Sequence, residues 1–195
     1  MKNDMKTETN VKRKGLSTTD LAYISICTVL IIICSWISIP TAVPFTMQTF
    51  AVFCSLNLLG GKKGTIAVLV YLLIGAAGVP VFSGFKSGYT IIIGPTGGYM
   101  LGFIFMGLIF TLGETLSKGK LKIRIAAMII GLIVCYAFGT AWFMTVYTNN
   151  TGAIGLGTAL TLCVIPFIIP DICKMILAIF LSEKLRKELR RGGLM

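Results

Sequence analysis

Apolar residues dominate the chain between about residues 21 and 182, where they form six segments separated by polar or glycine- and proline-rich breaks. A helix that crosses a bilayer needs roughly 20 mainly apolar residues, within a range of ~17–25. The pattern therefore predicts an all-α integral membrane protein with six transmembrane helices. Their expected bounds are 21–39, 45–59, 65–80, 96–116, 124–146 and 158–182.

The second and third segments are short for a full crossing. We expect these two helices to be tilted, or to end against protein rather than lipid. The breaks between the segments fall at 40–44, 60–64, 83–98, 117–124 and 148–152. Before the first segment, Ser17 is followed three residues later by Asp20, a spacing that is typical of a capping box and predicts the start of the first helix.

The composition supports a membrane protein built as one domain. Apolar residues make up 55% of the 195 residues and charged residues 13%, whereas a soluble domain carries roughly a quarter charged residues. We expect a basic cytoplasmic tail at 1–16, a six-helix substrate-binding membrane domain at 17–187 and a second cytoplasmic tail at 188–195.

The uneven distribution of positive charge predicts the orientation. Sixteen of the 18 Lys and Arg residues lie in the tails and connections expected on one side of the membrane. One, Lys86, lies on the other side, and Lys174 lies within the sixth segment. Cytoplasmic connections are enriched in Lys and Arg, so both termini are predicted to be cytoplasmic. The net charge of +11 forms no basic stripe interleaved with aromatic residues, so nucleic-acid binding is not expected.

Several enzyme classes are excluded by the residues that the chain lacks. It has no histidine, and its few carboxylates form no cluster in the sequence, so neither Ser–His or Cys–His catalysis nor a metal centre is expected. The stretch "GGKKGT" at 60–65 lacks the spacing of a phosphate-binding loop. The six cysteines lie in apolar segments without a C-x-x-C pair, and we interpret them as small buried side chains. We therefore expect no enzyme activity of these kinds, no ATPase motif and no cofactor.

Asp171 and Lys174 are the only charged residues between Ile125 and Glu183. Charged groups are costly in hydrocarbon and usually line a substrate or ion path. Pro170 suits the first position of a helix, so we expect a new helix to begin near it, with Asp171 in its first turn and Lys174 on the same face. Two interpretations stay open: a local ion pair that neutralises both groups, or a pair that faces a cavity open to the outside.

The longest outer connection, 82–99, combines five glycines with three consecutive isoleucines at 91–93. Irregular backbone near membrane depth has to pack on protein or line a cavity, so we expect a folded lid or re-entrant loop, with a flexible linker as the alternative. Gly98 and Gly102 have the G-x-x-x-G spacing of close helix packing. Besides Asp171 and Lys174, the candidate ligand-binding residues are Gln48, Phe82, Gly84, Lys86 and Tyr99.

Five stretches resemble the BioY family, the biotin-binding membrane subunits (S components) of energy-coupling-factor vitamin transporters. They are "VPFTMQTF" (43–50), "LLGGKKG" (58–64), "YLLIGAAGVPVF" (71–82), "GPTGGYMLGF" (94–103) and "PFIIPDICK" (166–174). The resemblance extends over about residues 17–187. This chain departs from the family pattern just before Asp171. The family usually has proline-glycine there, whereas this chain has Ile169 and Pro170.

The resemblance implies a six-helix bundle in the bacterial plasma membrane, with outer loops 40–48 and 82–95 closing over biotin as the transported ligand. It implies that Asp171 and Lys174 contact the ureido ring of biotin or order that contact. The implied partners are a transmembrane coupling subunit and two cytoplasmic ATPases. Three alternatives stay open: an S component for another small vitamin, an ion-coupled secondary transporter in which Asp171 takes up the proton, and a membrane-embedded assembly subunit.

Overall fold

Helices account for most of the chain in the computed structural model, which describes residues 15–41, 43–117, 120–152 and 154–192. Most of the expected tail at 1–16 and the last three residues of the expected tail at 188–195 lie outside the described residues. The elements are α1 (Thr18–Trp36), β1 (Ser38–Ile39), β2 (Phe45–Thr46), α2 (Gln48–Leu59), α3 (Gly61–Ala76), η1 (Ser83–Phe85), α4 (Tyr89–Ile93), α5 (Gly97–Ser117), α6 (Leu121–Thr151), α7 (Leu156–Cys163) and α8 (Ile165–Arg191).

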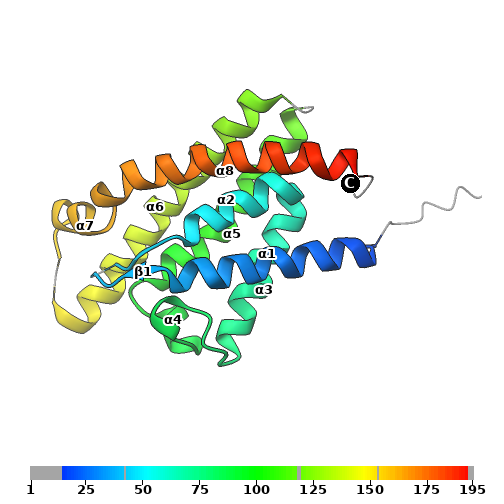
Figure 1. Ribbon diagram of the computed structural model, residues 1–195. Coiled ribbons are helices and arrows are strands. Elements are labelled where there is room, and N and C mark those ends of the chain that lie inside the picture. The colour runs from blue at the N-terminus through cyan, green and yellow to red at the C-terminus, as the bar shows by residue number, and fades with distance from the viewer. Residues whose placement is uncertain (1–14, 42, 118–119, 153, 193–195) are drawn as a thin grey trace, which may run out of the picture.

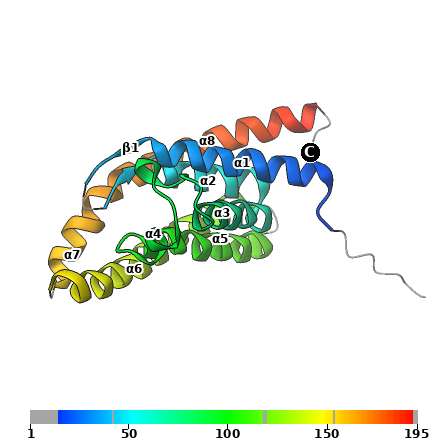
Figure 2. The same ribbon diagram turned by 90° about the horizontal axis from the view of Figure 1, so that it is seen from below.

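The long helices form two layers, which Figure 2 shows one above the other. Helices α1, α2 and α8 make up one layer, with α2 packed between the other two, and α3, α5 and α6 make up the second layer. The start of α1 and the end of α8 lie at the same end of the bundle in both views (Figures 1 and 2). The short antiparallel hairpin of β1 and β2 lies at the opposite end (Figure 1).

The first helix begins where the capping box predicts. The Ser17 side chain accepts a hydrogen bond from the backbone N–H of Asp20 (3.1 Å), and the Asp20 carboxylate accepts one from the N–H of Ser17 (3.2 Å). These reciprocal bonds satisfy two N–H groups that a helix start otherwise leaves without a partner. The prediction from the sequence is therefore confirmed.

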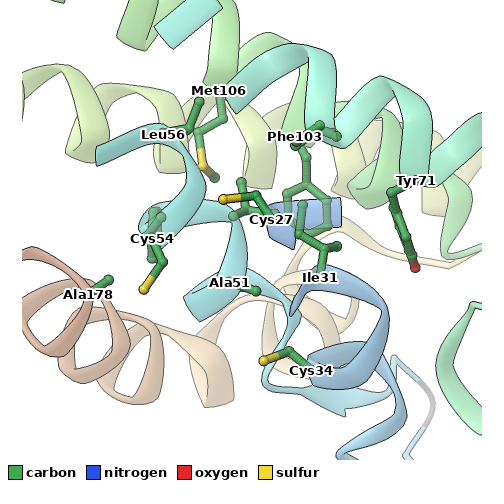
Figure 3. Close-up of a cluster of buried hydrophobic side chains, with 14 of the residues drawn as sticks. Cys27, Ile31, Cys34, Ala51, Cys54, Leu56, Tyr71, Phe103, Met106 and Ala178 are labelled. Atoms are coloured by element: carbon green, nitrogen blue, oxygen red, sulfur yellow. The ribbon is translucent and has the colours of Figure 1, made fainter. Parts of the chain in front are cut away.

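The core is centred on α2 and combines apolar side chains from several helices (Figure 3). Ala51, Val52, Phe53 and Leu56 of α2 are fully buried. The short second segment is thus surrounded by protein, which agrees with the expectation that it ends against protein; its tilt stays a prediction. Five of the six cysteines are buried, as expected, but the prediction is wrong for Cys173, which is exposed.

Glycines allow α5 and α6 to pack closely along their length. A Cβ atom on Gly98 would lie 2.3 Å from the Cβ of Trp142, and one on Gly102 would lie 2.7 Å from the Sγ of Cys135. Only a residue without a side chain fits at such an approach, because real Cβ contacts below 3.0 Å essentially do not occur. The packing role predicted for the two glycines is confirmed.

Four helical segments in the described part of the chain are long and apolar enough to cross a membrane: Thr18–Trp36, Gly97–Leu116, Leu121–Thr148 and Leu156–Leu189. Helix α2 has 12 residues and α3 has 16. At 1.5 Å per residue they are about 18 and 24 Å long, which is less than the ~30 Å hydrocarbon core. The six-helix topology therefore remains a prediction.

The sequence prediction for the last segment is wrong in its details. The segment is broken at Val164 (φ −125°, ψ −56°), and α8 begins at Ile165 and continues through Pro170. Asp171 is thus the seventh residue of α8 and does not lie in a first turn. A proline inside a helix leaves one carbonyl without its usual N–H partner, and membrane helices tolerate this where neighbouring groups compensate.

The break expected at 60–64 is also shorter than predicted. Helix α3 already begins at Gly61, and only Gly60, at φ +83°, separates it from α2. The Glu114 carboxylate accepts a hydrogen bond from the N–H of Gly61 at 2.7 Å, which supports the start of α3. A carboxylate is favourable there because it compensates the positive end of the helix dipole.

Candidate ligand-binding site

A cavity of about 370 Å³ lies among the connections at 40–48 and 82–95 and the helices that they join. We call them the first and second outer connections, after their predicted location. Small-molecule sites usually have volumes of about 300–1,000 Å³. Six of the seven candidate residues from the sequence line it: Gln48, Phe82, Lys86, Tyr99, Asp171 and Lys174. The seventh, Gly84, is not among the lining residues.

Asp171 projects from α8 into a set of hydroxyl and ammonium donors, and its side chain is 2% exposed. Its Oδ1 accepts hydrogen bonds from the Thr49 hydroxyl (2.8 Å) and from Lys174 Nζ (2.9 Å), and its Oδ2 accepts one from the Tyr136 hydroxyl (2.6 Å). An ionised carboxylate offers about four acceptor positions. Three of them are therefore used by groups in the described chain, which leaves one on Oδ2, and Asp171 is among the residues that line the cavity.

Lys174 uses its ammonium group to connect α8 to the first outer connection. Its Nζ donates to the Thr46 carbonyl (2.6 Å), to the Thr49 hydroxyl (3.1 Å) and to Asp171 Oδ1 (2.9 Å). It also lies 4.3 Å from the centroid of the Phe45 ring, which is close enough for a cation–π interaction. The ion pair of the first interpretation forms, and both residues line a cavity, as the second requires. That this cavity opens to the outside stays a prediction.

Gln48 is the first residue of α2, and its position depends on a buried aromatic pair. Its Nε2 donates to the Tyr71 hydroxyl at 3.0 Å, and the Tyr71 ring meets the Phe82 ring edge-on with centroids 5.5 Å apart. The Phe82 ring packs directly on Gly75, where a Cβ would lie 2.0 Å from its Cζ. Gln48, Tyr71 and Phe82 therefore form one continuous wall of the cavity.

The second outer connection is folded, as the isoleucines at 91–93 predict. Phe82 donates its N–H to the Lys86 carbonyl (3.0 Å) across a tight turn, and Gly88 donates its N–H to the Gly75 carbonyl (2.8 Å). Ile91 and Ile92 pack against the main core. Gly84 lies inside the turn at φ +70°, so the structure gives it a conformational role there.

Two tryptophans attach this connection to the helices. Trp36 Nε1 donates to the Pro80 carbonyl (3.0 Å), and its ring lies 5.0 Å from the ring of Phe85. Trp142 Nε1 donates to the Gly94 carbonyl (3.0 Å). These long-range bonds hold the residues before η1 against α1 and those after α4 against α6. They therefore help to position the second outer connection, which lines the cavity.

The sequence did not identify three residues that position the candidate ligand-binding residues: Thr49, Tyr71 and Tyr136. A hydroxyl group within an apolar segment was the available signal, but the chain has many such groups. Only the packing of α2, α3 and α6 shows which of them reach Asp171 or Gln48. Across the described ranges, no group of three or more cysteine or carboxylate side chains is arranged to hold a metal ion.

Comparisons with known proteins agree with this architecture. Residues 5–191 match the model of the BioY family. The chain is 39% identical over 163 residues to "Biotin transporter BioY" of Thermotoga maritima, covering 83% of this chain and 92% of the relative. It is 38% identical over 144 residues to "Probable biotin transporter BioY" of Pyrococcus horikoshii, covering 74% and 81% of the two chains.

A solved structure has the same fold. It is the crystal structure of the S-component for biotin from an ECF-type ABC transporter, with a TM-score of 0.75 and 28% sequence identity. The alignment covers 86% of this chain and 90% of the other. Together with the matched family model, these relatives confirm the resemblance found in the sequence: the chain belongs to the BioY family.

Proposed function

We propose that this chain captures biotin in the cavity among its outer connections and delivers it into the cell as the substrate-specific subunit of an energy-coupling-factor transporter. The relatives that cover most of the chain are named biotin transporters, and the similar solved structure is a biotin S-component. Within this chain, the proposal rests on one observation: the Asp171 carboxylate lines the cavity and is held there by Tyr136.

Asp171 is suited to the ureido ring of biotin because that ring presents N–H donors. The acceptor position left on Oδ2 takes one N–H of the ring, while Tyr136, Thr49 and Lys174 keep the carboxylate oriented. Because the orienting bonds exist before the ligand binds, little conformational freedom is lost on binding. Gln48 and the Phe82 ring supply a further polar group and an apolar surface in the same cavity.

Lys86 is our candidate for the carboxylate of biotin. The three N–H bonds of an ammonium group are all used in Lys174, by Thr46, Thr49 and Asp171. Lys174 is therefore a positioning residue in this proposal. Lys86 lines the cavity from the second outer connection, a different side from α8, which suits a ligand with a polar group at each end.

The proposed topology has six membrane helices with both termini in the cytoplasm of a bacterial cell. An even number of crossings is supported by the start of α1 and the end of α8, which lie at the same end of the bundle (Figure 1). The basic tails and connections support a cytoplasmic location for that end. The proposed domain bounds are those predicted from the sequence: tails at 1–16 and 188–195 and a membrane domain at 17–187. Residues 188–191 of the second tail continue α8.

The proposed partners are a transmembrane coupling subunit and two cytoplasmic ATPases, which supply the energy for uptake. The similarity to an S-component of an ECF-type ABC transporter supports them. This chain acts in the proposal as a binding and transport subunit rather than as an enzyme, and it does not bind nucleic acid.

Isothermal titration of detergent-purified protein with biotin tests the proposal. Asp171→Asn removes a charged acceptor, and a hydrogen bond to a charged group is worth about 1.5–3 kcal/mol, so we expect affinity to fall about 10- to 100-fold. Glu188→Gln is the matched control, because this carboxylate of the same helix is exposed and pairs only locally with Arg191 in the described chain. Affinity of the control is expected to equal that of the unaltered protein.

Absence of saturable biotin binding would overturn the proposal, and equal binding by Asp171→Asn would overturn the assigned site. A thermal-shift panel of other small vitamins distinguishes a different S component, since a tight ligand raises the apparent melting temperature. Biotin flux driven by a proton gradient in proteoliposomes without any ATPase would instead establish a secondary transporter.

A further inference from the structure

A long groove separates α6 from α8 and borders the ligand cavity at Leu132 and Tyr136, which line both. It has a volume of about 2230 Å³ and is lined mainly by apolar side chains of these two helices. Within the groove, the helices are joined by the Tyr136–Asp171 hydrogen bond and, nearer the basic end of α8, by the Arg124–Glu183 ion pair (3.0 Å). Figure 2 shows that α8 and α6 belong to different layers of the bundle.

The wall of the groove on α8 is a stripe of large apolar side chains at every fourth residue. Ile168, Ile172, Ile176 and Phe180 form this stripe, and Phe180 is 69% exposed. On α6 the opposite wall includes Ile129 and Ile133, which are also exposed. From Ile168 to Phe180 the stripe is about 18 Å long at 1.5 Å per residue, which is more than half of a ~30 Å hydrocarbon core.

The same stripe becomes basic towards the end of α8. Lys184, Lys187 and Arg191 line the groove one, two and three turns beyond Phe180. In all, five basic and two acidic residues line it, and one of the acids, Glu183, is already paired with Arg124. Neither Lys184 nor Lys187 has an ion-pair partner within the residues that the structure describes.

We propose that this groove binds an anionic phospholipid, with its acyl chains along the isoleucine stripe and its phosphate at Lys184 and Lys187. The change from apolar to basic side chains along one face of α8 matches the change from acyl chain to headgroup along a lipid molecule. Binding of a protein partner would not require this change. Basic pockets between membrane helices on the cytoplasmic side are suited to anionic headgroups. The basic end of α8 is also the end that the charge distribution predicts to be cytoplasmic.

Native mass spectrometry of the delipidated full chain in detergent tests this, with phosphatidylglycerol and phosphatidylcholine of identical acyl chains as probes. Each lysine near an anionic headgroup contributes roughly fivefold in affinity. We therefore expect preferential binding of phosphatidylglycerol, and a loss of about 30-fold in the double variant Lys184→Gln/Lys187→Gln. Binding of phosphatidylcholine is expected to change little.

The matched control is Lys120→Gln/Lys122→Gln, which removes the same charge from exposed residues at the start of α6 that do not line the groove. It is expected to bind phosphatidylglycerol as the unaltered chain does. Ile176→Asn, which makes the apolar wall polar, is expected to weaken both lipids. Equal binding of the two lipids, or an equal loss in the control, would overturn the proposal. The readout contains no biotin, so its outcome is independent of the transported ligand.

Discussion

The buried ion pair on α8 allows a quantitative test of the site's construction. Lys174→Met keeps an unbranched side chain of similar length but removes the ammonium group. Asp171 and Lys174 are 2% and 7% exposed in their side chains, so the variant leaves a carboxylate buried without its cation. Removing one partner of a buried pair typically destabilises a protein by about 3–5 kcal/mol.

We expect the lower end of this range, about 3 kcal/mol, because Tyr136 and Thr49 still donate to Asp171 and the cavity borders the pair. In a chain of this length, each kcal/mol lowers the melting temperature by about 2–4 °C, so the expected decrease is ~6–12 °C. Adding Asp171→Asn removes the uncompensated charge. The double variant is therefore expected to recover at least half of the loss.

The assay is thermal unfolding of ligand-free protein in detergent, followed by circular dichroism. Lys122→Met is the control, because Lys122 is exposed on α6 and such surface changes usually alter stability by less than ~0.5 kcal/mol. A double-mutant cycle isolates the coupling between the two charges. The reasoning is refuted if Lys174→Met melts within 2 °C of the control (roughly 0.5–1 kcal/mol), or if the two substitutions are additive.

Two further predictions concern the surroundings of the site. Tyr136→Phe removes the 2.6 Å hydrogen bond to Asp171 and is expected to lower the free energy of unfolding by about 1.5–3 kcal/mol, measured by the same thermal assay; an unchanged melting temperature would contradict it. Gly98→Ala places a Cβ against Trp142 and should cost about 1–3 kcal/mol by overpacking, whereas Gly157→Ala, with open space around it, should cost nothing. Equal melting temperatures of the two alanine variants would argue against close α5–α6 packing.

Patterns of residues close together in the sequence predicted most of the helices. Runs of apolar residues located α1, α2, α3, α5 and α6 within about five residues, whereas the last segment is divided into α7 and α8, and α8 ends nine residues later than predicted. The Ser17–Asp20 spacing located the first turn of α1. Both signals act over one or two turns of helix, so the sequence alone contains them. The spacing of Gly98 and Gly102 likewise predicted close packing, although not the partner helix.

The prediction at Pro170 shows where a local rule was insufficient. Proline is favoured at a helix start, but Pro166 already occupies the first turn of α8 and Pro170 lies inside the helix. The actual break, at Val164, lies two residues before Pro166, so the same helix-start rule applies to both prolines. Only the structure shows that the helix begins before Pro166 and continues through Pro170.

The sequence by itself determined that the chain is a helical membrane protein, which end is basic, and that Asp171 and Lys174 require an explanation. Hydropathy, charge and spacing are properties of the chain before it folds. Only the tertiary structure decided that Thr49, Tyr136 and Thr46, from elsewhere in the chain, satisfy this pair. The reason is physical: a hydrogen bond requires its atoms within about 3 Å, and helix packing alone brings residues so distant in sequence that close together.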